Sequence, residues 1–176
     1  MRLLSFPSAR FTLPAQEIGK VPVPELDRAA MGHALRLARA AGRRGEVPIG
    51  AVIITGGHVI AAASNRVERA RDATAHAELL ALHRASRKLD SWRLQGCTLY
   101  STLEPCPMCA GALLLARVDR VVYAADDPRK GAFRSVYDVL GNPGGNHHPE
   151  VTAGCEAAAA SALLQAFFQR RRGNAG

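Results

Sequence analysis

Two short stretches of this chain carry residue types that can do chemistry together, His76-Ala77-Glu78 and Pro105-Cys106-Pro107-Met108-Cys109. Cysteines three positions apart place both sulfurs on one face of a helical turn, close enough to hold one metal ion. Pro105 suits the first position of such a helix, where its missing N–H costs nothing. The helix dipole there favours the thiolate, which is the form that binds zinc.

A histidine completes the set of ligands. His76 supplies a third donor, so one tetrahedral position stays open, as in catalytic rather than structural zinc sites. Glu78 then carries protons for a water molecule held at the open position. The two side chains lie about 200° apart on an ideal helix, so we expect them to converge only in its first turn. A thioredoxin-like redox pair of Cys106 and Cys109 is the weaker alternative.

Composition places this site in a single globular domain. The chain has 176 residues, of which 48% are hydrophobic and 22% charged, enough to bury a proper core. Its 23 Lys and Arg against 15 Asp and Glu give a net charge of +8. Most of the positive charge is arginine, which suits phosphate contacts with a nucleic acid, although an Ala/Arg-rich composition alone gives the same excess.

The remaining cysteines and the hydropathy bear on the compartment. Cys97 and Cys155 lie in apolar runs and are interpreted as buried small hydrophobic residues. Because nothing suggests a disulfide framework, we expect a reducing compartment, the cytoplasm. No apolar run is long enough to span a bilayer, so no membrane partner is expected.

Hydrophobic periodicity and turn signals predict alternating strands and helices. The expected strands are Ile49–Ile54, His58–Ala62, Cys97–Leu103, Arg120–Ala125 and a brief one around Val151. The expected helices run from Pro24 to near Gly42, from near Thr74, and over Cys106–Arg117, Ser135–Leu140 and Cys155–Arg172. Strand–helix–strand around the cysteines implies a right-handed parallel crossover. The fold class is therefore α/β, a three-layer sandwich of a mixed five-stranded sheet with helices on both faces.

Three segments divide the chain. Residues 1–23 are broken by three prolines and predict a poorly ordered N-terminal arm that only faintly resembles an organelle transit peptide. Residues 24–172 form the domain, and residues 173–176 form a short tail. Within the domain, Gly141–Pro149 is a long Gly/Asn/Pro loop, which suggests a functional edge.

The H-x-E and P-C-x-x-C pair is the known signature of the zinc-dependent nucleobase deaminases. Longer stretches resemble bacterial-type tRNA-specific adenosine deaminases, members of the cytidine/deoxycytidylate deaminase superfamily. These stretches are Glu46–Val52, Asn65-Arg66, Asp72–Glu78, Thr102–Cys106, Met108–Ala112, Ser135–Leu140, Asn146-His147 and the Phe-Phe…Arg-Arg tail. The resemblance covers about Pro24 to Arg172 and implies the cytidine-deaminase-like fold.

The resemblance implies hydrolytic deamination of adenosine to inosine at the wobble position of a tRNA anticodon, by a homodimer with one Zn²⁺ per subunit. His76, Cys106 and Cys109 would hold the zinc. Glu78 would take a proton from the water, give it to the purine ring nitrogen and then protonate the leaving amine.

The resemblance also implies substrate contacts. Asn65 would hydrogen-bond the base, with a capped turn as the alternative, and Asp127 would lie near the ribose, with a surface turn as the alternative. Glu104 is expected to bond backbone or orient the ligands rather than act as a second acid. The expected phosphate-binding residues are Arg129, Lys130, Arg170, Arg171 and Arg172. Phe167 and Phe168 are expected to anchor the last helix in the core.

Two departures and two competing functions remain open. Ala73 replaces a proline of the family, which predicts a less stiff loop before His76, and Phe133-Arg134 replace small residues, which predicts a reshaped RNA-facing rim. A free-base or nucleoside deaminase acting on guanine or cytosine would share the zinc site. A nucleic-acid-binding module with structural zinc would not need Glu78.

Overall fold

The computed structural model describes residues 23–141 and 146–173 and contains one five-stranded sheet with the order β2-β1-β3-β4-β5. The strands are β1 (Gly50–Thr55), β2 (His58–Ser64), β3 (Cys97–Leu103), β4 (Arg120–Ala125) and β5 (Glu150–Ala153). The helices are α1 (Val23–Arg43), α2 (Val67–Ala70), α3 (Ala77–Leu89), α4 (Pro107–Leu115) and α5 (Ala157–Gly173). Strand β1 is antiparallel to β2 and β3, while β3, β4 and β5 are parallel. The predicted mixed sheet is confirmed.

The hairpin between β1 and β2 forms around Gly56 and Gly57. Both residues have positive φ, 55° and 78°, which side chains with a Cβ rarely adopt and which a tight hairpin turn requires. The glycine pair therefore sets the register of the two strands, which pair Thr55 with His58 and Gly50 with Ser64.

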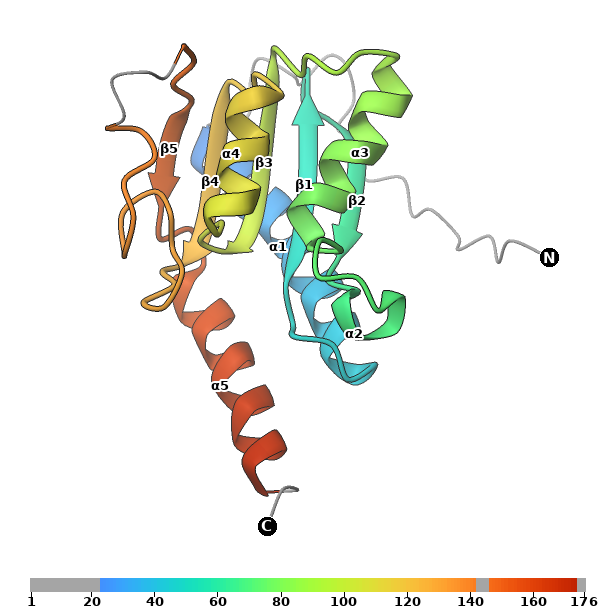
Figure 1. Cartoon of the computed structure of the whole chain (residues 1–176), viewed down its shortest axis with the longest axis vertical. Helices are drawn as coiled ribbons and strands as arrows, with labels where there is room; N and C mark the ends of the chain where they lie inside the picture. Colours follow the sequence, from blue (N-terminus) through green and yellow to red (C-terminus); the bar gives the residue numbers. More distant parts are fainter. Residues whose placement is uncertain (1–22, 142–145, 174–176) are drawn as a thin grey trace, which may run out of the picture.

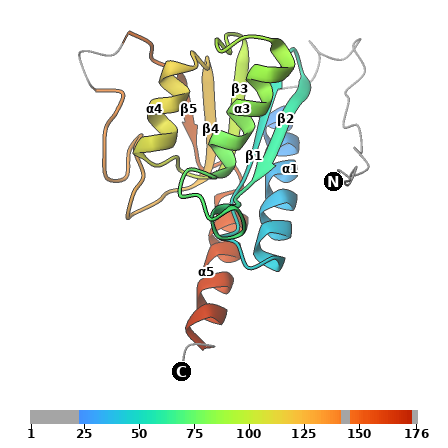
Figure 2. The ribbon, with the colours of Figure 1, turned by 45° about the vertical axis from the view of Figure 1, so that its right-hand side comes forward.

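Side chains on successive strand residues point to opposite faces of the sheet and build two separate cores. Ile53, Leu99 and Val121 pack with residues of α3 and α4. Their neighbours in the sequence, Val52, Tyr100 and Val122, pack with residues of α1 and α5 on the other face. Figures 1 and 2 show these two helical layers on either side of the sheet. The three-layer α/β sandwich is confirmed.

The parallel strands bring two loops to one end of the sheet. Leu103 pairs with Ala125 at the carboxyl ends of β3 and β4, so the segments that follow, Glu104–Cys106 and Asp126–Ser135, lie together. Open α/β sheets bind ligands at this edge. Helix α5 projects past the same end of the sheet in both views (Figures 1 and 2).

Some sequence-based predictions of elements differ from the structure. Ser135–Leu140 is not a helix but an irregular run with turns and bends. The N–H of Val139, which a helix would direct to the Ser135 carbonyl, donates to the Ala132 carbonyl instead, and the N–H groups of Val136 and Tyr137 both donate to Gly131. The helix predicted over Cys106–Arg117 begins at Pro107 and ends at Leu115. The expected arm and tail, residues 1–23 and 173–176, lie outside the described residues except for Val23 and Gly173, as does 142–145 of the long loop.

The helices were also compared with the length of a bilayer. Among the described residues, none of the helices combines the length and the apolar character that crossing a membrane needs.

Candidate metal and active site

The three predicted metal ligands lie at the starts of two helices that begin side by side. His76 is the N-cap of α3 and Cys106 the N-cap of α4, and both have extended backbone. Cys109 follows in the first turn of α4. The first helical position is therefore taken by Pro107 rather than by Pro105. His76 stands just outside its helix and Glu78 in the first turn, which is how the two converge.

The distances among these ligands fit a zinc ion. His76 Nδ1 lies 3.7 Å from Cys106 Sγ and 3.4 Å from Cys109 Sγ, and the three donor atoms are within 4.8 Å of one another. Zinc at its usual distances from sulfur and imidazole nitrogen separates two tetrahedral ligands by about 3.6 Å. One histidine and two cysteines are also a donor set typical of zinc. The residues therefore fit the ion, with Nδ1 as the imidazole ligand.

The ligands share protons in a way that prepares the site for a cation. A hydrogen bond from the Cys109 thiol, with a further one from His76, lowers the pKa of Cys106 to about 4. The same contact between the sulfurs, together with burial, raises the pKa of Cys109. The hydrogen bond to Cys106 raises the pKa of His76. A metal ion that binds here replaces these shared protons.

Glu78 lies beside the ligands and is buried, with 3% of its surface exposed. Its Oε1 accepts a hydrogen bond from Ser101 Oγ at 3.4 Å, whereas the buried Oε2 has no hydrogen-bond partner among the described residues. Burial raises the pKa of Glu78. A buried carboxylate oxygen without a partner is costly unless a ligand or water meets it, so we expect Oε2 to meet a ligand or a water molecule.

Asn65, the predicted base-contacting residue, is held by a carboxylate that we did not predict. Asn65 is buried and donates from Nδ2 to Oε2 of Glu46 at 3.4 Å. Glu46 is also buried and accepts the backbone N–H groups of Glu68 and Arg69. Because a carboxylate only accepts hydrogen bonds, the amide nitrogen of Asn65 must face Glu46. In the sequence, Glu46 stands out only as the first residue of the stretch Glu46–Val52 that resembles the family, and no pattern predicts its contact with Asn65.

Hydrogen bonds restrict the loop before His76, in which Ala73 stands where a proline is expected from the family resemblance. Asp72 Oδ1 accepts hydrogen bonds from both the backbone N–H and the hydroxyl of Thr74, at 2.8 and 2.7 Å. The backbone N–H of Ala75 donates to Asp72 at 3.1 Å. These bonds restrict the loop on either side of Ala73, and the lower stiffness expected from the missing proline stays a prediction.

Glu104 organises the opposite loop, as expected of a residue that bonds backbone. It is buried and accepts from the N–H groups of Asp127, Phe133, Arg134 and Ser135 and from the Ser135 hydroxyl. Burial would raise the pKa of Glu104, but these hydrogen bonds outweigh it and hold the pKa below its usual value.

Within that loop, the other residues singled out from the sequence have distinct environments. Asp127 accepts the N–H groups of Arg129 and Lys130, which is a turn contact. Phe133 packs in the core instead of lining the rim, and Arg134 forms a two-bond ion pair with Asp126. Phe133 therefore does not line the rim, whereas Arg134 is exposed, and the reshaping of the rim expected from Arg134 stays a prediction.

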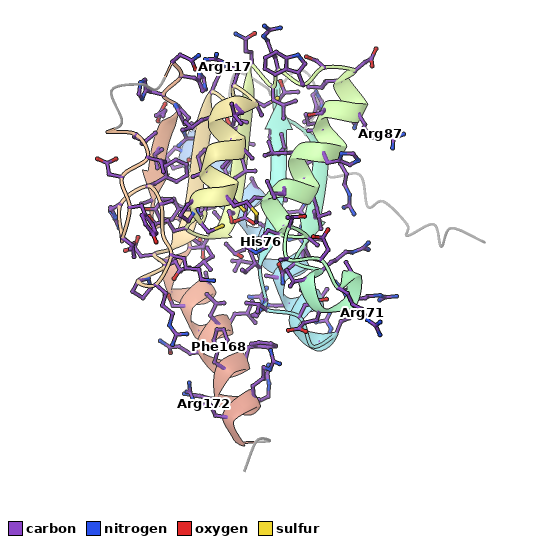
Figure 3. All side chains as sticks on the ribbon, in the orientation of Figure 1. Arg71, His76, Arg87, Arg117, Phe168 and Arg172 are labelled. Carbon is purple, nitrogen blue, oxygen red and sulfur yellow. The ribbon has the colours of Figure 1, made fainter. Side chains whose placement is uncertain are left out.

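The predicted phosphate-binding residues fall on this end of the molecule. Arg129 and Lys130 are exposed, and the Lys130 charge is close enough to act on the pKa of His76. Figure 3 shows Arg172 on α5 beyond the end of the sheet that holds His76. Phe167 is buried as expected, but Phe168 is 39% exposed, so it is not a core anchor in this chain.

Comparison with known proteins agrees with this geometry. The family model of the MafB19-like deaminases matches residues 26–172. The chain is 44% identical over 146 residues to the tRNA-specific adenosine deaminase of Bacillus subtilis (strain 168), covering 83% of this chain and 91% of that protein.

Solved structures give the same result. A structure from a study of A-to-I editing by tRNA:A34 deaminases at the wobble position of transfer RNA has a TM-score of 0.76 and 43% identity, covering 77% of this chain and 99% of that one. A guanine deaminase from Nitrosomonas europaea has a TM-score of 0.66 and 28% identity, covering 93% and 97%. The cytidine-deaminase-like fold is thereby confirmed. On the family match and the identity across most of both chains, this chain belongs to the family of tRNA-specific adenosine deaminases and is a deaminase enzyme.

Proposed function

We propose that the chain deaminates adenosine to inosine by hydrolysis at the wobble position of a tRNA anticodon, with a zinc-activated water. The observation that carries the chemistry is the buried Glu78 Oε2, which has no partner among the described residues and lies beside a His-Cys-Cys ligand set. The tRNA substrate is the one named for the relative and for the structural neighbour that are 44% and 43% identical to this chain.

His76, Cys106 and Cys109 would hold one Zn²⁺, which supplies the chemistry of lowering the pKa of a bound water towards about 7. Glu78 handles the protons. Its carboxylate accepts the proton of the attacking water and delivers it to the adenine ring nitrogen as the oxygen adds to C6. A second transfer through Glu78 protonates the leaving amine, so adenosine and water give inosine and ammonia.

The residues around the metal ligands would bind the substrate. Because Glu46 holds the amide nitrogen of Asn65, the amide carbonyl is the group left to accept a hydrogen bond from the base. Asp127 is proposed to lie near the ribose of the flipped nucleotide in addition to capping its own turn. Arg129, Lys130 and the exposed arginines of α5, Arg170, Arg171 and Arg172, would bind the phosphates.

A free base is the alternative substrate, as in the guanine deaminase neighbour. A neutral purine has no phosphates, so it gives no role to a net charge of +8 or to three exposed arginines at the end of α5. We therefore favour tRNA over guanine or cytosine.

We further propose a homodimer that buries the outer face of α4. This helix contains no charged residue, and it exposes 38% of Met108 and 76% of Leu115. An apolar helix face of this kind calls for a partner. Since copies of a chain with a charge of +8 repel each other, an uncharged face is where a second copy can approach.

The dimer is tested by measuring mass in solution with light scattering. Wild-type protein is expected at twice the chain mass, and Leu115→Glu is expected to be monomeric. Phe168→Glu, at a side chain that is 39% exposed on α5, is the matched control and should stay dimeric, because α5 packs on the opposite face of the sheet from α4. A monomeric wild type, or equal dissociation of both variants, would rule out this interface.

A cytoplasmic location follows from the same proposal. The four cysteines are all free thiols in the structure, and two of them must stay reduced to bind a metal, which a reducing compartment permits.

The test of function compares substrates and variants. Wild-type protein, loaded with zinc, is given an anticodon stem-loop with adenine at the wobble position, the same stem-loop with guanine there, and free guanine. We expect inosine from the first only, measured by mass spectrometry of the nucleosides. Deamination of guanine without inosine formation would favour the small-molecule enzyme instead.

Two substitutions separate proton transfer from metal binding. Glu78→Ala should retain zinc, measured by elemental analysis, but lose about 10²–10⁴-fold in kcat, the usual contribution of general acid–base catalysis. His76→Ala should lose the metal as well. Near-normal turnover by Glu78→Ala would exclude Glu78 as the proton carrier.

A further inference from the structure

Helix α2 lies in a stretch that the sequence alone presents as a charged loop. It spans Val67–Ala70 and follows directly on the buried Asn65. Three arginines on the helix and its flanks, Arg66, Arg69 and Arg71, are all exposed. Figure 3 shows Arg71 on the same end of the molecule as His76. These arginines therefore stand next to the proposed active site, although the mechanism gives them no role.

One exposed ion pair links α2 to the arginine-rich end of α5. Glu68 Oε1 lies 3.9 Å from Arg171 Nη1, and the Arg171 guanidinium lies 5.8 Å from the centroid of the Phe167 ring. Glu68 is the one acid among residues 66–71, and its partner on α5 offsets its charge. The exposed arginines on α2 and α5 therefore outnumber the nearby exposed acids, Glu68 and Asp72.

The backbone that carries these arginines is held by hydrogen bonds to the buried side chain of Glu46. Glu46 accepts the N–H of Arg69 at 2.8 Å and that of Glu68 at 3.2 Å, in addition to the Asn65 amide. Arg71, at the end of α2, has a left-handed backbone with φ of 53°, a conformation that costs free energy for a residue with a Cβ. A fixed backbone lowers the entropy lost when a ligand is bound.

We infer that α2 and α5 form one phosphate-binding surface, the arginine rim, composed of Arg66, Arg69, Arg71, Arg170, Arg171 and Arg172. Its ligand would be the backbone phosphates of the single-stranded RNA on either side of the nucleotide that enters the site. Arginine is the side chain best shaped for phosphate, and a single flipped base offers too little contact area for affinity. This inference rests on the proposed function and assigns its RNA contacts.

Charge-matched double variants test the rim. Arg69→Gln/Arg71→Gln removes two charges from α2. Arg87→Gln/Lys88→Gln removes two from the far end of α3, which Figure 3 places at the opposite end of the molecule from His76. Each protein is titrated with the wobble-adenine stem-loop at several salt concentrations between 50 and 200 mM.

We expect the α2 variant to bind more weakly and to lose roughly 1.4–1.8 from the slope of log affinity against log salt, at 0.7–0.9 for each lost phosphate contact. The control variant should keep the wild-type slope. The kcat at saturating RNA and the zinc content should stay at wild-type values in both, because neither substitution touches the metal site.

Three outcomes would overturn the inference. An unchanged slope in the α2 variant removes α2 from the RNA surface, and equal losses in both variants show a general effect of charge. If wild-type protein binds vesicles of anionic phospholipid through the same two arginines and ignores the stem-loop, the rim is a membrane surface. Failure of wild-type protein to deaminate the stem-loop would instead refute the proposed function, which separates the two failures.

Discussion

Two irregular segments flank the metal site, and each is fixed by one buried carboxylate. The first, residues 65–72, carries Asn65 and α2 and is held by Glu46 through three hydrogen bonds. The second, residues 126–135, is held by Glu104 through five. The first segment has only the single turn of α2 and the second has no helix or strand, so in each a side chain supplies acceptors that the backbone requires.

The two carboxylates differ in what they connect. Glu104 immediately precedes the P-C-x-x-C stretch, and the loop it holds also bonds back to that stretch, because Ala132 N–H donates to the Pro105 carbonyl at 3.0 Å. Glu46 bonds Asn65 and the first turn of α2, and its segment is also linked to a ligand, because Arg66 N–H donates at 3.0 Å to the carbonyl of Ala75, next to His76. The two carboxylates differ in that Glu104 makes more hydrogen bonds, whereas Glu46 holds the Asn65 side chain itself. We therefore expect Glu104 to matter more for stability and Glu46 more for substrate binding.

The largest expected effect comes from Glu104→Ala. It leaves several buried N–H groups without an acceptor, so we expect a loss of about 3–5 kcal/mol in the free energy of unfolding, as when a buried polar network is broken. Urea denaturation measures the loss, and elemental analysis should show a lower zinc content. If Glu46→Ala lowers the free energy of unfolding by as much as Glu104→Ala does, the proposed difference in stability between the two segments is wrong.

At low pH we expect the second segment to lose stability, because Glu104 loses its negative charge. Its pKa is held below the usual value by hydrogen bonds, so its stabilising effect is fully present above the ordinary glutamate pKa and is lost as pH falls through the lowered one. The gap in unfolding free energy between wild type and Glu104→Gln should therefore narrow from pH 7 towards pH 3. A gap that is constant over this range would contradict the role of the charge.

A smaller effect is expected from Gly131→Ala. A Cβ at this position would lie 2.1 Å from Glu104 Oε2 and 2.7 Å from the Asp127 carbonyl, so the second segment must shift. Overpacking of this kind costs about 1–3 kcal/mol. Gly32→Ala in α1 is the control, because it meets nothing closer than 3.9 Å and should be neutral or stabilising. Thermal melts of both variants measure this difference, and we expect a lower melting temperature for Gly131→Ala only.

Substrate binding should report on the first segment. In Glu46→Gln the new amide can present its own NH₂ to Asn65, which frees the Asn65 amide to rotate. We expect KM for the stem-loop to rise about tenfold, equivalent to about 1.4 kcal/mol, with kcat and zinc content unchanged. The double variant with Asn65→Ala should add little to Asn65→Ala alone, because the two side chains act as a unit. A fall in kcat with constant KM would assign Glu46 to the metal site instead.

The smallest effect is expected from Glu68→Ala, at the contact between α2 and α5. The ion pair with Arg171 is exposed on both sides, so its loss should change the free energy of unfolding by no more than about 0.5 kcal/mol. RNA affinity should rise rather than fall, since a negative charge leaves the arginine rim. Weaker RNA binding would mean that Glu68 is needed to orient Arg171.

Most of the sheet was predictable because it depends on local pattern. The β1–β2 hairpin follows from alternating apolar runs around Gly56-Gly57, and the crossover from β3 through α4 to β4 follows from element order. The failures have a physical cause in common. Ser135–Leu140 has a helical pattern, but the Val139 N–H donates to the Ala132 carbonyl instead of to Ser135, in a loop that Glu104 holds from 31 residues earlier in the chain.

The sequence by itself predicted the chemistry, because the residue types and spacing of His76, Glu78, Cys106 and Cys109 favour a zinc site at helix starts over a redox pair. Only the tertiary structure decided which groups surround that site. The sequence predicted backbone hydrogen bonds for Glu104 but not their donors, and it predicted no role for Glu46, because the burial of both carboxylates against distant backbone depends on the packing of the whole sheet. The pairing of α2 with α5 is likewise a contact across 103 residues, which no local pattern encodes.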